Sequence, residues 1–468
     1  MKSQVEGNKI LVIGMARSGQ AAVKLLLKAG ASRVIANDQK GRAELESEAG
    51  GLLDDPRVTY AGGGHPEQLL EGVTMVIKSP GVKPHLPILK KAAQSAVPVY
   101  SEIELAYGFS PAEIVGITGT NGKTTTTSLV GEILKKQFHR VYVAGNIGFP
   151  LCEAVDLAEE GDVIVAELSS FQLENTDRFR ASIAAILNIS PDHMDYHGTM
   201  EQYIVSKSKL LNNQYENDVA VLNHDDQVVR GLSPRAKGRV LFFSRKSALE
   251  SGVFMDNGNI VLIENGKVEF SCPSKDLRIP GPHNLENALA AVAVSWSKGV
   301  IPEHIAATLR TFPGVPHRLE FVAEKDGVTF INDSKGTNLD ATLTALKAIH
   351  GPKILIAGGL DKGSIFDPLI RKLKEENVHK LILLGETAPK IKEAAVREGF
   401  TDVLIANSIA EAVVHSYGNA SKGDTVLLSP ACASWDMFKN FEERGDIFKS
   451  EVLKLEEGLY YGKSPHRA

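Results

Sequence analysis

Cysteine is scarce in this sequence, and neither sign of charge is in large excess. Cys152, Cys272 and Cys432 lie far apart and have neither metal-ligand nor CxxC spacing. Such usage is typical of a reducing compartment. The formal net charge is −5 over 468 residues, with no long block of one sign. Nothing in the charge pattern therefore favours a nucleic-acid partner.

Long hydrophobic runs are also absent. No apolar stretch approaches the roughly 20 residues that span a bilayer. The first apolar run, KILVIG at 9–14, is short and ends in glycine, which indicates a first strand and not a signal peptide. We therefore expect a soluble, cytoplasmic and monomeric protein without a membrane partner.

The pattern that is present alternates strands with helices. Strand–glycine–helix openings occur at 9–14 and 113–118, and a third unit has its first strand at 328–333. Further short apolar strands alternate with helical segments, which predicts α/β folds built on parallel sheets. Proline and glycine interrupt the pattern near 100–112 and at 311–318. We predict three domains, at 1–101, 102–312 and 313–468.

The segment GITGTNGKTTTTSLV, residues 116–130, indicates a phosphate-binding loop of unusual spacing. The common pattern requires glycine five residues before the Gly-Lys-Thr, where this chain has Ile117. However, a strand precedes the glycines and a helical pattern follows Lys123. Backbone N–H groups and a helix N-terminus could then bind phosphate oxygens, while Lys123 reaches the outer phosphates and the Thr124 hydroxyl suits Mg²⁺.

Polar residues follow several strands of the same unit. Glu167 ends DVIVAE, Asn146 follows another strand, and Asp192, His193 and Asp195 follow a third. Open α/β sheets bind ligands at the carboxyl ends of their strands. Each residue alone could be an ordinary solvated loop residue, but together they favour a site.

The first unit carries an incomplete dinucleotide fingerprint. GMARSG at 14–19 opens a helix, and Asp38 ends the next strand about 20 residues later. An NAD-dependent oxidoreductase is therefore one hypothesis. Against it, Ala16 replaces the middle glycine, and its methyl group would obstruct the close approach of a pyrophosphate.

Seven segments together resemble the Mur ligase family: GITGTNGKTTT, ELSSFQLE, LNISPDHMDYHG, GPHNLENALAA, PHRLE, NDSKGTN and LSPACASWDMFKNFEERG. They occur in collinear order up to about residue 447. The resemblance implies a Rossmann-like UDP-binding domain, a central P-loop ATPase domain and a C-terminal Rossmann-like domain for the amino acid. The implied activity is an ATP-dependent ligase that adds D-glutamate to UDP-N-acetylmuramoyl-L-alanine through an acyl phosphate and a tetrahedral intermediate, in peptidoglycan precursor synthesis.

The resemblance also implies residue roles in the nucleotide site. Thr124 and Glu167 would bind one Mg²⁺, and His193 with a carbamylated Lys207 would bind a second. Lys123, Lys207, His193, Lys335 and Asp333 would serve catalysis, with Asp333 and His193 as candidates for accepting a proton from the amine. The implied ATP contacts are Gly119, Thr120, Asn121, Gly122, Lys123, Thr124, Thr125, Asn284, Asn287, Arg318 and Asp333.

Two further sets of contacts follow from the same resemblance. The UDP-substrate would contact Ala16, Arg17, Ser18, Asp38, Ser79, Pro80, Gly81, Asn146 and His193. The D-glutamate would contact Thr337, Lys362, Ser434 and Phe441.

Other hypotheses explain less of the chain. Folylpolyglutamate synthases share the loop but have no counterpart of the first α/β unit. Sister ligases that add a diamino acid carry an Asp-Asn-Pro-Arg string, which is absent here. A nucleotide-sensing binding protein would have no use for Lys335, Lys362 and the C-terminal motif together.

Overall fold

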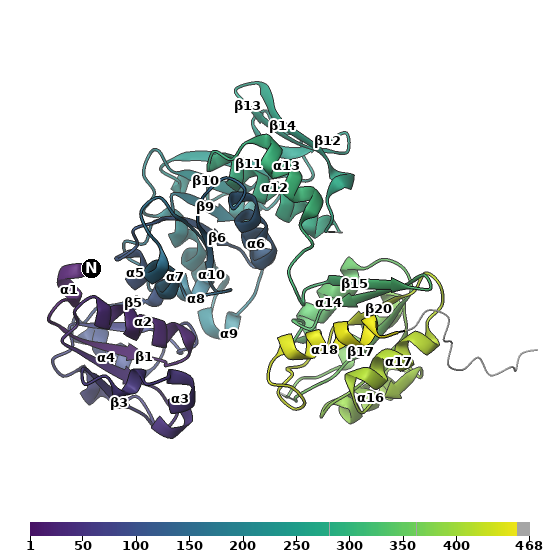
Figure 1. Cartoon of the computed structure of the whole chain (residues 1–468), viewed down its shortest axis with the longest axis horizontal. Helices are drawn as coiled ribbons and strands as arrows, with labels where there is room; N and C mark the ends of the chain where they lie inside the picture. Colours follow the sequence, from purple (N-terminus) through teal and green to yellow (C-terminus); the bar gives the residue numbers. More distant parts are fainter. Residues whose placement is uncertain (280, 362, 456–468) are drawn as a thin grey trace, which may run out of the picture. The chain divides into compact units, whose positions relative to one another are not determined.

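The computed structural model of the chain describes residues 1–279, 281–361 and 363–455. These residues form three sheets in two compact units (Figure 1). The first unit comprises residues 1–278 and 284–312 and contains two sheets. The second unit comprises the described residues of the short segment 279–283 and those from Pro313 onward, and it contains the third sheet. Within the described ranges, no helix is both long and apolar enough to cross a bilayer. The predicted boundaries at 101/102 and 312/313 fall between the sheets and stay predictions.

The first sheet has five parallel strands in the order β3-β2-β1-β4-β5. The order reverses between β1 and β4, which is where open α/β sheets bind ligands. Its strands are β1 (Lys9–Ile13), β2 (Arg33–Asn37), β3 (Val58–Ala61), β4 (Met75–Lys78) and β5 (Val99–Ser101), and its helices are α1 (Lys2–Val5), α2 (Arg17–Lys28), α3 (Arg42–Ala49), α4 (Pro87–Gln94) and α5 (Glu102–Tyr107).

The second sheet has nine strands in the order β14-β13-β12-β11-β10-β9-β6-β8-β7. Its strands are β6 (Glu113–Thr118), β7 (Val141–Gly145), β8 (Val163–Glu167), β9 (Ile183–Ile186), β10 (Val219–Asn223), β11 (Arg239–Ser244), β12 (Gly252–Asp256), β13 (Asn259–Glu264) and β14 (Lys267–Pro273). Its helices are α6 (Lys123–Leu134), α7 (Leu151–Leu157), α8 (Ser170–Glu174), α9 (Met194–His197), α10 (Met200–Ser208), α11 (Gln227–Arg230), α12 (Pro282–Ser297) and α13 (Pro302–Thr311).

The third sheet has the order β15-β16-β20-β17-β18-β19, and all its pairings except β15–β16 are parallel. Its strands are β15 (Glu320–Lys325), β16 (Val328–Asn332), β17 (Lys353–Ala357), β18 (Val378–Leu383), β19 (Val403–Ile405) and β20 (Thr425–Leu428). Its helices are α14 (Leu339–Ala348), α15 (Asp367–Glu375), α16 (Ala388–Arg397), α17 (Ile409–Asn419) and α18 (Phe441–Leu453).

The predicted α/β class is confirmed, and burial explains the continuous apolar strands. β8 and β20, for example, are buried along their whole length, as expected when helices cover both faces of a parallel sheet. The prediction of parallel strands throughout missed the antiparallel strands β12–β14 and β15. A sequence signal was available, because these hairpins turn at Asn257-Gly258, Asn265-Gly266 and Asp326-Gly327, all with positive φ.

Candidate active site

The glycine loop at 119–122 lies between β6 and α6, as a phosphate-binding loop requires. Gly122 caps the helix with φ +81, a conformation that glycine adopts without strain. Residues of α6 that include Leu129, Val130, Ile133 and Leu134 are buried and anchor the helix on the sheet. The loop amides and the N-terminus of α6 therefore form a potential anion site.

The segment after β9 clamps this loop. The Asn121 N–H donates to the side-chain oxygen of Asn188 at 2.8 Å, and the Asn188 amide donates back to the Asn121 carbonyl. The Thr120 hydroxyl lies 3.1 Å from the Tyr203 hydroxyl and accepts the Ser190 N–H. Sequence reasoning gave Asn188 and Tyr203 no role, although Tyr203 stands four residues before Lys207 and thus on the same helix face.

Lys207 lies in this loop environment and is almost completely buried, with 1% of its surface exposed. Its Nζ donates to the Gly119 carbonyl at 2.8 Å, and Lys123 Nζ donates to the same carbonyl at 2.9 Å. Burial and the nearby charge of Lys123 lower the pKa of Lys207 well below its usual value, against the opposing effects of Asp192 and Glu167. The neighbouring Lys209 instead donates to carbonyls of residues 174 and 176.

Glu167 is the best-placed carboxylate for a cation. Its Oε1 accepts from the Asn146 amide at 2.8 Å, whereas its buried Oε2 has no hydrogen-bond partner among the described residues. A buried carboxylate oxygen left in this state fits a metal ligand. Within the described ranges no three His, Cys, Asp or Glu side chains form a metal-binding group. Mg²⁺ is commonly held by one or two carboxylates together with substrate phosphates and water.

Two asparagines of α12 lie beside the glycine loop and α6. Asn287 donates from its amide nitrogen to Asn284 at 3.2 Å and accepts from the Thr126 hydroxyl at 3.3 Å. A Cβ at Gly122 would overlap the Asn287 oxygen, so this side chain lies directly against the loop.

His193 occupies a different environment. Its backbone is left-handed, with φ +54, and its side chain is 48% exposed. Its ring lies 4.8 Å from that of Phe171, and Nε2 is 3.4 Å from Asp192. The structure thus leaves the imidazole accessible to ligands.

The predicted UDP-substrate residues of the first sheet lie around the turn after β1. The Ser79 hydroxyl donates to the Gly14 carbonyl at 2.7 Å, and the Met15 N–H donates to Asp38 at 2.6 Å. Gly19 is required here because a Cβ would overlap the Gly14 carbonyl. Arg17, in the first turn of α2, donates to the Gly148 carbonyl in the loop between β7 and α7 at 3.2 Å. The structure therefore brings together the 14–19 turn, Asp38 and Ser79.

In the second unit, three loops meet at the carboxyl ends of β16, β20 and β17. They are linked by the Ala431 N–H to the Gly336 carbonyl and by the Leu360 N–H to the Ala433 carbonyl, both at 2.9 Å. Thr337 and Ser434 are carried by two of these loops, and Lys362 lies outside the described residues. The buried Arg444 donates to both Ser334 and the Cys432 carbonyl, which fastens two of the loops together. Burial lowers the pKa of Arg444 to about 10.

Asp333 follows β16 and is held rigidly. It accepts from the Ser429 hydroxyl at 2.7 Å and from the Leu319 N–H at 3.2 Å. Burial raises its pKa to about 6, with the positive charge of Arg318 among the opposing effects. Lys335 lies with its Nζ 5.8 Å from the centre of the Phe441 ring.

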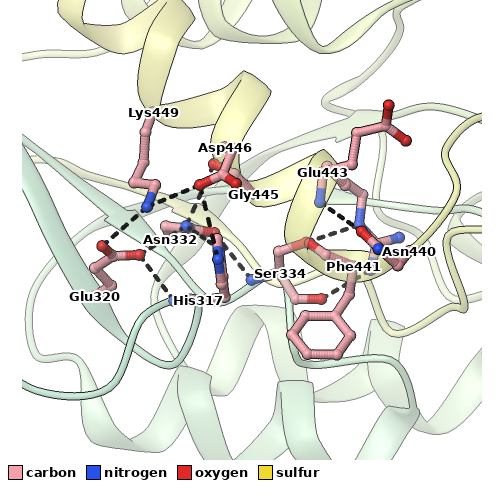
Figure 2. Close-up of polar contacts among 11 residues, drawn as sticks. His317, Glu320, Asn332, Ser334, Asn440, Phe441, Glu443, Gly445, Asp446 and Lys449 are labelled. Carbon is pink, nitrogen blue, oxygen red and sulfur yellow. Dashed lines mark hydrogen bonds and ion pairs between the residues drawn. The ribbon is translucent and has the colours of Figure 1, made fainter. Parts of the chain in front are cut away.

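Figure 2 shows the network that fixes the chain on both sides of Arg318. His317 and Leu319 both have positive φ, at +62 and +43. The His317 N–H donates to Glu320 at 2.8 Å, and its ring nitrogen lies 3.1 Å from the Asn332 amide. Burial lowers the pKa of His317, which favours a neutral ring that can accept this bond. Helix α18 completes the network: a Cβ at its Gly445 would overlap the His317 ring, and its Lys449 pairs with Glu320 at 3.3 Å.

Comparison with known proteins agrees with this arrangement. Three family models match in chain order: the Mur ligase MurD-like N-terminal domain at residues 8–101, the Mur ligase middle domain at 117–295 and the Mur ligase glutamate ligase domain at 317–432. Among solved structures, UDP-N-acetylmuramate-alanine ligase from Thermotoga maritima superposes with a TM-score of 0.59 at 19% identity, covering 95% of this chain and 99% of the other. A second neighbour, MurF ligase from Thermotoga maritima in complex with ADP, has a TM-score of 0.56 at 17% identity and covers 97% of each chain.

Curated relatives are much closer in sequence. The UDP-N-acetylmuramoylalanine–D-glutamate ligase of Pelotomaculum thermopropionicum is 50% identical, over 96% of this chain and 98% of its own. Its counterpart from Thermoanaerobacter pseudethanolicus is 49% identical, over 97% and 99%, and that from Clostridioides difficile is 45% identical, over 96% and 99%. These matches cover nearly the whole of each chain, and together with the three family models they establish that the chain belongs to the Mur ligase family.

Proposed function

We propose that this chain is an ATP-dependent ligase that forms the amide bond between UDP-N-acetylmuramoyl-L-alanine and D-glutamate, in the synthesis of peptidoglycan precursors. The observation that carries the proposal is the 45–50% identity, over nearly the whole chain, to relatives named for this ligation. The phosphate-binding loop and its buried neighbours support the ATP-dependent part.

Amide formation in water requires an activated acyl group. An oxygen of the alanyl carboxylate attacks the γ-phosphorus of ATP, the bond to the bridging oxygen breaks, and ADP leaves. The D-glutamate ammonium loses one proton, its nitrogen attacks the acyl carbon and loses a second proton, and the tetrahedral intermediate expels phosphate to leave the amide N–H. Negative charge accumulates in both steps, so we assign Lys123 and Lys335 to charge stabilisation. Asp333 and His193 remain the two candidates for accepting a proton from the amine.

We assign the magnesium ligands from the same geometry. Thr124 and the unpartnered Oε2 of Glu167 would hold one Mg²⁺, whose charge would stabilise the phosphates when it is bound. A second ion would use His193 and Lys207. Since a lysine ammonium cannot bind a cation, Lys207 would first have to be carbamylated.

The environment of Lys207 supports that modification. Its lowered pKa favours the neutral amine, which can attack CO₂. A nitrogen–carbon bond forms, one electron pair of CO₂ moves onto oxygen, and the nitrogen releases a proton to solvent. The resulting carbamate has two oxygens that share one negative charge, and oxygen ligands of this kind are those that Mg²⁺ prefers. We expect Lys207→Ala to lose activity and to regain part of it with short carboxylic acids; full activity without them would remove Lys207 from the site.

The function is tested by phosphate release from ATP in the presence of UDP-N-acetylmuramoyl-L-alanine. D-glutamate should stimulate release, whereas L-glutamate and L-lysine should not. Lys123→Ala should abolish ligation, while Lys135→Ala, at the exposed C-terminal end of the same helix, should not. Stimulation by L-lysine, or turnover by Lys123→Ala, would contradict the proposal.

A further inference from the structure

A buried lysine that the reaction does not use lies beside the UDP-substrate turn. Lys78 is the last residue of β4 and directly precedes Ser79, Pro80 and Gly81. Only 2% of its side chain is exposed, so it is unavailable to contact a ligand itself. Burial lowers its pKa, because the ammonium loses hydration, and Glu174 offsets part of this effect. A charge buried at this cost requires a specific set of partners.

Those partners come from the second sheet's helices. Lys78 Nζ donates to the Tyr196 hydroxyl at 2.9 Å, and that hydroxyl donates to Glu174 Oε2 at 2.7 Å. The ammonium is 3.9 Å from the same carboxylate oxygen. Burial and Glu174 raise the pKa of Tyr196, so the phenol keeps the proton that it donates. We call Lys78, Tyr196 and Glu174 the polar bridge.

The polar bridge is continuous with the support of His193. Tyr196 is in α9, the short helix that starts immediately after His193. The Phe171 ring contacts Tyr196 edge-on at 4.4 Å and His193 at 4.8 Å, and it stacks on His197 at 5.5 Å. His197 in turn lies 2.9 Å from the Ser170 hydroxyl. Displacement of the Tyr196 hydroxyl would therefore disturb the packing that orients the His193 segment.

We propose that the polar bridge sets the spacing between the turn at Ser79–Gly81 and the segment at His193, two elements that come from different sheets of one compact unit. This inference rests on the proposed function and on the contacts that the family resemblance implies, in which both elements contact the same UDP-linked substrate. Lys78, Tyr196 and Glu174 are thus positioning residues. Without the bridge, the two ends of the substrate are no longer held at a fixed separation, whereas the ATP loop keeps its own contacts with residues 188–190.

Tyr196→Phe isolates the bridge, because it removes the hydroxyl and keeps the ring against Phe171. We expect the dissociation constant and KM for UDP-N-acetylmuramoyl-L-alanine to rise about tenfold, which corresponds to the lower end of the range for a lost hydrogen bond to a charged group. KM for ATP should change less than twofold. Tyr142→Phe removes a hydroxyl that donates to the Leu157 carbonyl at 3.1 Å, elsewhere in the same unit, and should change neither constant.

Two further variants distinguish positioning from general loosening. The glutamine of the Glu174→Gln variant can still accept a hydrogen bond from Tyr196, so this variant should raise the dissociation constant by an intermediate amount. The double variant Lys78→Met with Tyr196→Phe should have nearly the same dissociation constant as Lys78→Met alone. Binding of the UDP-linked substrate is measured by calorimetry, separately from turnover. A wild-type chain that binds but does not ligate would refute the proposed function alone. Equal dissociation constants for wild type and Tyr196→Phe would overturn the proposed role of the polar bridge, and so would an equal rise in the KM values for the UDP-linked substrate and for ATP. A wild-type chain that binds no UDP-linked substrate would overturn both the proposed function and the role of the bridge.

Discussion

Replacing Asp333 by Asn should make the second unit more stable while it impairs ligation. The carboxyl is buried and its pKa rises from an ordinary value of 3.8 to about 6, so the folded state resists ionisation. At about 1.36 kcal/mol for each pH unit, the ionised form costs the fold about 3 kcal/mol above pH 6. An asparagine avoids this cost, since its oxygen can accept the Leu319 N–H and its nitrogen can donate to the Ser429 hydroxyl.

The direction in which the stability contribution of Asp333 changes with pH follows from proton linkage. Between pH 3.8 and about 6 the folded state binds more protons than the unfolded state, so the contribution of Asp333 to stability is lost as pH rises through this window. The advantage of Asp333→Asn should therefore grow by about 1.4 kcal/mol from pH 5 to pH 8, or tenfold in the unfolding constant. Activity should fall by about 10² or more, since Asp333 is assigned to nucleotide binding and is a candidate proton acceptor.

The two tryptophans make the measurement selective. Trp296 belongs to the first unit and the exposed Trp435 to the second, so urea unfolding in a Trp296→Phe background follows the second unit by fluorescence. Unfolding free energies are compared at pH 5 and pH 8 with and without Asp333→Asn. The reasoning is refuted if the variant is destabilised at both pH values, or if its gain is the same at each.

Three further outcomes follow from the site. Gly122→Ala places a Cβ against a neighbouring amide oxygen at a residue with φ +81, which costs about 1–2 kcal/mol of strain in the loop. KM for ATP should therefore rise at least about tenfold, and an unchanged KM would contradict this reasoning. Glu167→Gln should shift the Mg²⁺ titration of activity to about tenfold higher concentration, and an identical titration would exclude Glu167 as a ligand. Lys449→Met breaks the pair with Glu320 and should raise KM for ATP about threefold. Lys454→Met, at the exposed C-cap of the same helix, should leave it unchanged.

Much of the fold was predictable because its signals are local. Apolar runs and glycines predicted the strands, and β6 matches its predicted bounds of 113–118. The prediction of parallel sheets missed the hairpins of β12–β14 although Asn-Gly turns mark them, because the strand–helix alternation on which it rests extends over far more of the chain than these short turns. The phosphate-binding loop proposed at residues 119–124 is also a local signal, because such a loop needs its glycines, lysine and threonine adjacent in sequence.

The electrostatic character of the site was decided by tertiary structure. From the sequence alone, Lys207 is expected to be an ordinary exposed helix residue. In the structure, α10 buries its side chain beside the Gly119 carbonyl, and this burial lowers its pKa. Lys78 and Tyr196 are 118 residues apart in sequence, and only the packing of two sheets in one unit makes them a bridge. The sequence by itself therefore determined which reactive groups the chain has. Their burial, and with it their protonation and partners, depends on segments distant in sequence, because the cost of a charge is set by everything packed around it.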